Sequence, residues 1–218
     1  LDVNVNGTSV VFEAARKAKV ARLVYASSAA IYGDNANLPL SETEKPAPLS
    51  PYGMDKWYGE NIAQLYFHLH GISSAGLRFF NVYGPRQDPK SPYSGVISIF
   101  LGAAQQDKEV TIFGDAEQSR EFIYVKDNIT AILLAMNSEN KNAAVFNVAS
   151  GTEITLNQLI ETMNASLQKT IQKKYLPPRA GDIVKSAANI SHIYRGLGFR
   201  TQHSLAEGLK VTYESLTR

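Results

Sequence analysis

The spacing of apolar and polar positions predicts an α/β fold. Apolar residues recur at helical spacing over 10–18, and the short apolar run over 21–28 predicts a buried strand. After a polar loop, helical periodicity returns over 51–69, Gly71 ends it, and 72–80 reads as another strand. Strands that alternate with helices form a parallel sheet covered by those helices, so we expect this architecture in the first half of the chain.

The second half of the chain has longer loops and shorter elements. Its pattern predicts helices over 96–105, 126–136 and 156–167, near Ile190 and over 205–216, and strands over 110–113, 121–125, 145–148 and 173–176. We expect a smaller mixed α/β lobe that packs against the sheet of the first half.

Composition narrows the possible functions. The 218 residues are 44% hydrophobic and 19% charged, which is typical of an ordinary globular protein. A net charge of +2 without a lysine or arginine cluster gives no reason to expect nucleic acid as a partner, and no apolar run reaches the length that crosses a membrane. The absence of cysteine excludes disulfides and thiol metal sites, no metal site is expected, and a cytoplasmic location is natural.

Tyr52 and Lys56 are the first candidates for chemistry, because residues four apart share one face of a helix. A neighbouring ammonium favours the phenolate, which can remove a proton from a substrate hydroxyl while hydride leaves the same carbon. Ser28 ends its predicted strand, where open α/β sheets bind ligands, and could hydrogen-bond that hydroxyl. The Tyr-x-x-x-Lys spacing alone also fits a packed tyrosine and a solvated lysine, so the hypothesis depends on the strand and its serines.

Three motifs in order resemble those of a known family. They are Ser-Ser-Ala-Ala-Ile-Tyr-Gly at 27–33, Pro-Tyr-Gly-x-x-Lys at 51–56, and Leu-Arg-Phe-Phe-Asn-Val-Tyr-Gly-Pro at 77–85. The chain resembles the extended short-chain dehydrogenase/reductases, and within them the NAD-dependent nucleotide-sugar epimerases. The resemblance covers nearly the whole chain. It implies that 1–84 form the C-terminal part of a Rossmann-like NAD-binding domain, and that 85–218 are mainly a substrate lobe with some segments that return to that domain.

The same resemblance assigns roles in the first half of the chain. It implies that Tyr52 is the catalytic base, that Lys56 is its electrostatic partner and a ligand of the cofactor ribose, and that Ser28 contacts the substrate hydroxyl. The implied cofactor is NAD, bound against Tyr52, Lys56, Ser27 and Phe80.

A nucleotide-sugar substrate is implied by residues of the second half. By the resemblance, Asn81 donates to the substrate diphosphate, Arg120 and Arg179 grip its phosphates, and Asp182 lies toward the ribose. Arginine suits this role because its planar guanidinium presents paired donors to phosphate oxygens. Taken in isolation, each arginine would read as a solvated surface charge, and Asn81 as a turn residue at a strand end.

Further positions bear on which sugar is bound. Val96, Thr111 and Phe113 match segments that line the uridine pocket in the family, although core packing is an alternative for each. Ser186 matches a position that faces the 2-substituent of the sugar, where a small residue leaves room for an N-acetyl group; the alternative is that it starts a turn. Related dehydratases and decarboxylases carry acidic residues just after the serine or threonine, where this chain has Ala29 and Ala30. By the resemblance, this argues against water elimination and for oxidation and re-reduction at one carbon.

These residues predict 4-epimerisation of UDP-N-acetylglucosamine and UDP-N-acetylgalactosamine, of UDP-glucose and UDP-galactose, or of both pairs. The alternatives are a UDP-glucuronate 4-epimerase, a sugar-nucleotide 4-reductase and a non-catalytic sugar-nucleotide-binding fragment. By the resemblance we also expect a homodimer through the helices over 6–19 and 51–69.

One family motif is missing. No three of the fifteen glycines have the Gly-x-x-Gly-x-x-Gly spacing that places a pyrophosphate at a helix N-terminus. The chain also starts at Leu1 without an initiating methionine. We therefore expect it to be the C-terminal two-thirds of a longer enzyme, inactive by itself and a poor binder of NAD.

Overall fold

The structure is a computed structural model that describes residues 2–91, 94–179 and 183–216. The chain forms two compact units, each assembled from three separate stretches of sequence. Unit 1 consists of Leu1–Phe80, Ile129–Val148 and Ala188–Arg200, and unit 2 of Asn81–Asn128, Ala149–Ala187 and Thr201–Arg218.

Unit 1 contains a three-stranded parallel sheet in the order β1-β2-β6. These strands are β1 (Leu23–Ser28), β2 (Ser74–Phe79) and β6 (Ala143–Val148). Ser28 pairs with Phe79, which in turn pairs with Val148, so the carboxyl ends of all three strands lie level. The central strand β2 is buried along nearly its whole length, as expected for a strand with a neighbour on each side and helices over the sheet.

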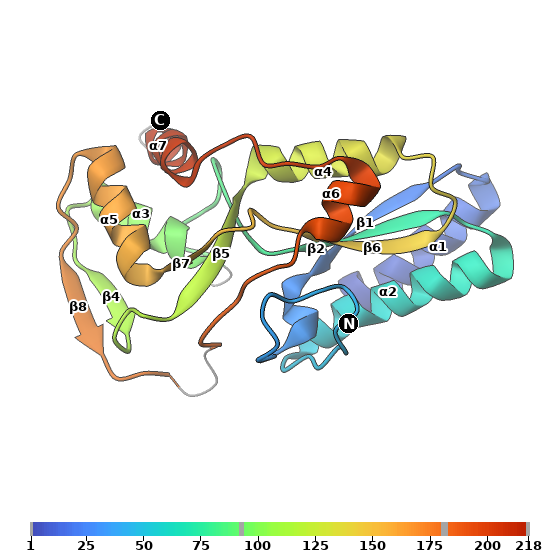
Figure 1. Cartoon of the computed structure of the whole chain (residues 1–218), viewed down its shortest axis with the longest axis horizontal. Helices are drawn as coiled ribbons and strands as arrows, with labels where there is room; N and C mark the ends of the chain where they lie inside the picture. Colours follow the sequence, from blue (N-terminus) through green and yellow to red (C-terminus); the bar gives the residue numbers. More distant parts are fainter. Residues whose placement is uncertain (1, 92–93, 180–182, 217–218) are drawn as a thin grey trace. The chain divides into compact units, whose positions relative to one another are not determined.

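Helices cover the sheet of unit 1. Figure 1 shows α1 (Gly7–Ala18) and α2 (Pro51–His70) on one side of it and α6 (Ser191–Leu197) on the other. The first turn of α1 follows a short π-helix, η1 (Asp2–Asn6), and a 3-10 turn, η2 (Ala29–Tyr32), follows β1 directly.

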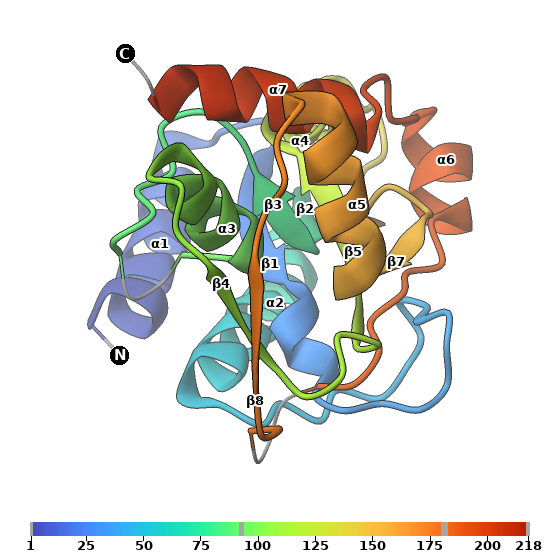
Figure 2. The same cartoon turned by 90° about the vertical axis from the view of Figure 1, so that its left-hand side faces the viewer.

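Unit 2 is a mixed α/β unit with a single apolar core. Strands β3 (Asn81–Tyr83), β5 (Ser119–Tyr124) and β7 (Glu153–Thr155) form one sheet, and β4 (Val110–Phe113) pairs in parallel with β8 (Lys173–Leu176), as Figure 2 shows. Its helices are α3 (Val96–Gln105), α5 (Leu156–Leu167) and α7 (Leu205–Leu216), while α4 (Val125–Asn137) starts in unit 2 and continues in unit 1. The core consists of buried side chains from α3, α5 and α7 and from both groups of strands. They include Phe100, Ile112, Tyr124, Ile160 and Leu209.

The predicted α/β class with a Rossmann-like parallel sheet is confirmed. The helices over 96–105, 156–167 and 205–216 have the predicted bounds, because each carries a clear apolar stripe. The short elements η1, η2, β3 and β7 were not predicted, whereas the four-residue strands β4 and β8 were predicted with their observed bounds. Within the described residues, no helix is both long and apolar enough to cross a membrane.

Candidate functional site

The first turn of α2 carries Tyr52. Ser50 is extended, with φ −140° and ψ 154°, and its hydroxyl accepts a hydrogen bond from the Gly53 N–H at 3.1 Å, which caps the helix. Pro51 suits the next position because the first helical N–H needs no partner within the helix. Lys56 follows one turn later, with its Nζ 5.7 Å from the centroid of the Tyr52 ring, and the Tyr52 side chain is half exposed.

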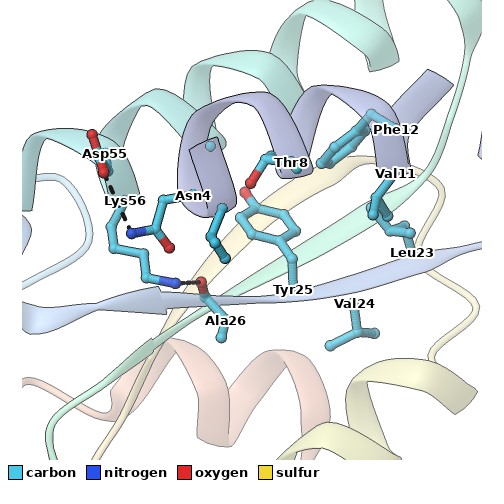
Figure 3. Close-up of a pocket in the computed structure, with 13 residues that line it drawn as sticks. Asn4, Thr8, Val11, Phe12, Leu23, Val24, Tyr25, Ala26, Asp55 and Lys56 are labelled. Carbon is cyan, nitrogen blue, oxygen red and sulfur yellow. Dashed lines mark hydrogen bonds between the residues drawn. The ribbon is translucent and has the colours of Figure 1, made fainter. Parts of the chain in front are cut away.

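Lys56 also connects α2 to β1. Its Nζ donates to the backbone oxygen of Ala26 at 3.1 Å, as Figure 3 shows. Asp55, its neighbour, accepts a hydrogen bond from the Asn4 amide at 3.3 Å. A cavity of about 340 Å³ lies beside these contacts and is lined by side chains of α1, α2 and β1. Lys56 is therefore fixed at one end of this cavity, with its ammonium over the strand that carries the serines.

Gly53 allows the start of α2 to approach η2. A Cβ atom on Gly53 would lie 2.6 Å from the backbone oxygen of Ala30, a distance that real side chains do not tolerate. The helix that carries Tyr52 therefore packs directly on the backbone that follows Ser28. Sequence reasoning did not assign this role to Gly53, although its place inside a predicted helix was a signal that something packs closely there.

Ser28 and Ser27 have different environments. The Ser28 hydroxyl accepts from the Ala30 N–H at 3.1 Å and caps η2, so its own hydrogen can still be donated to a ligand. The Ser27 side chain is buried and its hydroxyl donates to Glu60 at 2.6 Å. A cofactor contact at Ser27 would therefore use its backbone.

Phe80 directly follows β2. Its backbone N–H donates to the Val148 oxygen at 3.1 Å, and its buried ring lies 6.4 Å from the ring of Tyr32, measured between centroids. Ser28, Tyr52, Lys56 and Phe80 all lie at or over the carboxyl end of the same parallel sheet, which is where open α/β sheets bind ligands.

In unit 2, five of the predicted substrate residues line one cavity of about 620 Å³. Its walls are formed by α3, β4 and β5 and by the segment that follows β8. The five are Val96, Thr111, Phe113, Arg120 and Arg179. The cavity combines apolar side chains with two guanidinium groups, a composition that suits a ligand with an aromatic ring and anionic groups.

The two arginines of this cavity are held differently. The guanidinium of Arg179 lies over the ring of Phe113, with its Cζ 3.5 Å from the ring centroid. Arg120 is half-buried, and its Nη1 donates to the backbone oxygen of Ser119 at 2.8 Å. Each guanidinium group carries five N–H donors in a planar arrangement, which is a geometry that suits phosphate oxygens.

Asn81 and Ser186, two further predicted substrate residues, also belong to unit 2. Asn81 is exposed in β3, and its amide donates to the backbone oxygen of Glu121 at 2.8 Å. Ser186 is half-buried in a segment without regular structure, and it is not among the residues that line the 620 Å³ cavity. Asp182 lies outside the described residues. Among the described residues, no group of three or more histidine, aspartate and glutamate side chains could hold a metal ion.

Comparisons with known proteins match this chain to one protein family. The family model described as "NAD dependent epimerase/dehydratase family" matches residues 1–149. A UDP-glucose 4-epimerase of Mycolicibacterium smegmatis is 34% identical over 213 residues, which are 97% of this chain and 67% of that protein. The chain thus spans about two-thirds of the length of this relative.

Two solved structures have the same fold at similar identity. The UDP-N-acetylglucosamine 4-epimerase from Methanobrevibacter ruminantium M1, in complex with UDP-N-acetylmuramic acid, superimposes with a TM-score of 0.95 at 36% identity, covering 99% of this chain and 69% of that one. The UDP-glucose 4-epimerase of Thermotoga maritima, with UDP-glucose, gives 0.93 at 38% identity, with coverages of 99% and 70%.

Proposed function

This chain belongs to the NAD dependent epimerase/dehydratase family, and we propose that it carries out NAD-dependent 4-epimerisation of a UDP-sugar. The observation that carries the proposal is the Tyr52–Lys56 pair, held over the carboxyl end of a parallel sheet beside Ser28. Relatives named as UDP-sugar 4-epimerases support the same reaction.

The residues of unit 1 fit a nicotinamide nucleotide. Within the described residues, the Lys56 ammonium makes one hydrogen bond, to Ala26, which leaves two N–H donors for the hydroxyls of a ribose. Phe80 offers an apolar ring next to the end of β2, where a flat aromatic ring can pack. We propose that Lys56, Tyr52, Phe80 and the backbone of Ser27 hold NAD, which when bound accepts a hydride from the sugar and returns it.

Tyr52 acts as the general acid and base of the reaction. Its side-chain oxygen removes the proton from the C4 hydroxyl of the sugar while that carbon is oxidised to a ketone, with the Lys56 ammonium 5.7 Å from the centroid of its ring. The Ser28 hydroxyl donates to the same C4 oxygen and fixes its direction. After C4 has been reduced on its opposite face, Tyr52 would give its proton back to the C4 oxygen, which yields the epimeric hydroxyl.

Inversion requires the 4-keto sugar to turn over while the nucleotide stays bound. We propose that the 620 Å³ cavity of unit 2 holds the nucleotide, with Val96, Thr111 and Phe113 against the uridine and Arg120 and Arg179 on the diphosphate. Asn81 adds a donor to the diphosphate, and Asp182 contacts the ribose. Strong anchoring at the phosphates leaves the sugar itself loosely held, which allows it to rotate.

The sugar specificity is also a proposal. We infer that an N-acetylated sugar is accepted, because Ser186 is small at the position assigned to the 2-substituent. UDP-glucose and UDP-galactose fit the same space with less contact. The solved relatives act on sugars of both kinds by name, so the substrate panel of any assay should include both and UDP-glucuronate.

We further propose a homodimer through the helices over 6–19 and 51–69. Large apolar side chains on these helices are exposed within one chain: Val10 is 66% exposed, Leu65 48% and Leu69 60%. Such a surface is typical of a helix-helix interface between subunits. Light scattering should give twice the mass of the chain, and a monomeric mass at micromolar concentration would contradict the interface.

The reaction is tested by Tyr52→Phe in the enzyme containing this chain. Removing the phenolic oxygen takes away the acid-base group and should reduce epimerisation by about 100- to 10,000-fold. Binding of UDP, measured by calorimetry, should stay unchanged, because the nucleotide is assigned to unit 2. Epimerisation by this variant at the wild-type rate, followed by NMR of the two UDP-sugars, would rule out the mechanism.

A further inference from the structure

A buried ion pair connects α2 to the sheet of unit 1. Arg78 of β2 donates to Glu60 of α2 through two bonds, Nε to Oε1 at 2.8 Å and Nη2 to Oε2 at 2.7 Å, and the two side chains are 4% and 8% exposed. Burial by itself lowers the pKa of Arg78, and the hydrogen bonds and charge of Glu60 more than offset this, so the pKa is raised. Because desolvation cancels much of the Coulomb gain, an ion pair of this kind contributes little net stability.

Both members of the pair use their remaining hydrogen-bonding capacity on neighbouring elements. Glu60 Oε1 accepts from the Ser27 hydroxyl at 2.6 Å, and Arg78 Nη1 donates to the Tyr32 hydroxyl at 2.8 Å. Tyr32 in turn donates to Asn147 of β6 at 2.6 Å. Burial raises the pKa of Tyr32 to about 12, so its hydroxyl stays protonated and can act in both bonds. The result is a connected polar network in the interior of unit 1.

This network touches each element to which the proposed chemistry is assigned. Glu60 lies one turn beyond Lys56 and two turns beyond Tyr52, so the three share one face of α2. Ser27 is the residue before Ser28 at the end of β1. Arg78 is two residues before Phe80, and alternate residues of an extended segment point the same way.

We propose that Glu60 is a positioning residue that sets the register of α2 on the end of β1. Arg78 orients the Glu60 carboxylate, which accepts a hydrogen bond from the Ser27 hydroxyl. This bond fixes the position of α2 along β1. The position of α2 in turn determines whether Tyr52 and Lys56 lie beside Ser28. The inference rests on the proposed function of these three residues. Loss of the network would leave each side chain in place on its element but out of register with the others.

The test compares variants of the enzyme containing this chain. Glu60→Leu with Arg78→Met removes both charges together and fills the space with apolar side chains, a change that usually leaves stability near or above the wild type. Here we expect a melting temperature lower by a few degrees, because Ser27 and Tyr32 lose a hydrogen-bond partner. We also expect a KM for UDP-glucose within about threefold and a kcat reduced by about 100-fold, as misplacement of about 1 Å can cause. Asp107→Asn, which removes an exposed carboxylate paired with Lys169 in unit 2, is the control and should change none of these.

A second measurement does not depend on turnover. Crystal structures of the wild type and the double variant give the distance from Lys56 Nζ to the backbone oxygen of Ala26, which is 3.1 Å here. In the double variant this distance should lengthen, because α2 shifts along β1. If kcat and this distance are both unchanged, the positioning role is wrong. If the wild type does not epimerise any UDP-sugar, the proposed function fails, and the distance still decides the role of Glu60.

Ser27→Ala provides an independent variant in case the double substitution unfolds the protein. It removes one hydrogen bond and leaves the ion pair, and should reduce kcat by about 10-fold at most. Its effect should vanish when Glu60→Leu and Arg78→Met are already present, because the bond partner is then gone. A loss of the same size in both backgrounds would overturn the proposal, because Ser27 would then act without Glu60. No loss in the wild-type background would also overturn it, because the bond between Ser27 and Glu60 would then have no effect on turnover.

Discussion

The guanidinium of Arg179 stacks on the face of Phe113, with its Cζ 3.5 Å from the ring centroid. Both residues line the 620 Å³ cavity of unit 2. This cation–π contact holds the guanidinium against the ring at the wall of the cavity, and its planar set of five N–H donors suits phosphate oxygens. The aromatic side chain thus prepares the cation for a bidentate contact before any ligand arrives, which reduces the entropy lost on binding.

Arg179→Ala should separate the phosphate contribution from that of the base. Charge-assisted hydrogen bonds contribute about 1.5–3 kcal/mol, so the affinity for UDP should fall by about 10- to 100-fold. Affinity for uridine, which has no phosphate, should change less than about threefold. Calorimetry with both ligands makes the comparison.

Two variants control this experiment. Arg179→Lys keeps the charge but not the planar pair of donors, and should recover only part of the UDP affinity. Lys174→Ala removes an exposed cation of β8 that pairs with Glu109, and should have no effect. An equal loss of UDP and uridine affinity in Arg179→Ala would show that the arginine does not contact phosphate.

Ser186→Tyr tests the proposed specificity. A bulky ring at the position assigned to the 2-substituent should exclude an N-acetyl group and tolerate a hydroxyl. We expect kcat/KM for UDP-N-acetylglucosamine to fall by at least about 10-fold, with that for UDP-glucose nearly unchanged, because adding atoms to a fitted pocket costs about 1–3 kcal/mol. Ser186→Ala should act on both sugars like the wild type. Equal losses on both sugars in the tyrosine variant would refute the assignment.

The sequence predicted the elements of unit 1 well because their signals are local. The Ser50-Pro51 pair marks the start of α2, and Gly71, in the left-handed region with φ 67°, marks its end. The positions of Tyr52, Lys56 and Ser28 at the sheet follow from that helix and from the strand that ends in serine. For these residues, knowledge of the helix start and the strand end was enough.

The rest depended on contacts between distant parts of the chain. Nothing local to Glu60 indicates that it is buried, since a glutamate in a helix is usually exposed, and its partner Arg78 lies in a strand that reads as apolar. The contact of Arg179 with Phe113 likewise joins the last residue of β4 to a residue in the segment that follows β8. Such partners are fixed by tertiary packing, which single-sequence periodicity does not report.

Two glycines of α2 should respond in opposite directions to alanine. In Gly53→Ala the new Cβ would meet the Ala30 oxygen at 2.6 Å, so the start of α2 must move; we expect a loss of about 1–3 kcal/mol in the free energy of unfolding and reduced turnover. In Gly59→Ala the nearest atom is Thr8 Cγ2 at 3.7 Å, an ordinary contact, so the better helix former should stabilise the protein by about 0.5–1 kcal/mol.

Urea unfolding monitored by circular dichroism measures both changes. The Gly59 variant is the matched control, because it makes the same substitution in the same helix without the close approach. A neutral or stabilising effect of Gly53→Ala would mean that α2 and η2 do not pack as closely as 2.6 Å implies.

The N-terminus of α7 should make stability depend on pH. Glu207 accepts hydrogen bonds from the Ser204 hydroxyl at 2.7 Å and from the Ser204 N–H at 2.8 Å. Both bonds lower the pKa of Glu207, and the bond from the hydroxyl has the larger effect. The folded state therefore prefers the carboxylate, and this stabilisation is complete above the pKa of an unfolded glutamate, about 4.3, and is lost as pH falls through the lower folded value.

Glu207→Gln removes this pH dependence. At neutral pH the variant should melt at a lower temperature than the wild type, because an amide is a weaker acceptor at a helix N-terminus than a carboxylate. The two melting temperatures should converge as pH falls through the lowered pKa of Glu207, where the wild-type carboxyl becomes protonated. Glu161→Gln, which changes an exposed carboxyl of α5, is the control and should follow the wild type at every pH. A difference in melting temperature between Glu207→Gln and the wild type that stays constant across the pH range would contradict the assignment. Protonation of Glu207 would then not change the stability of the protein.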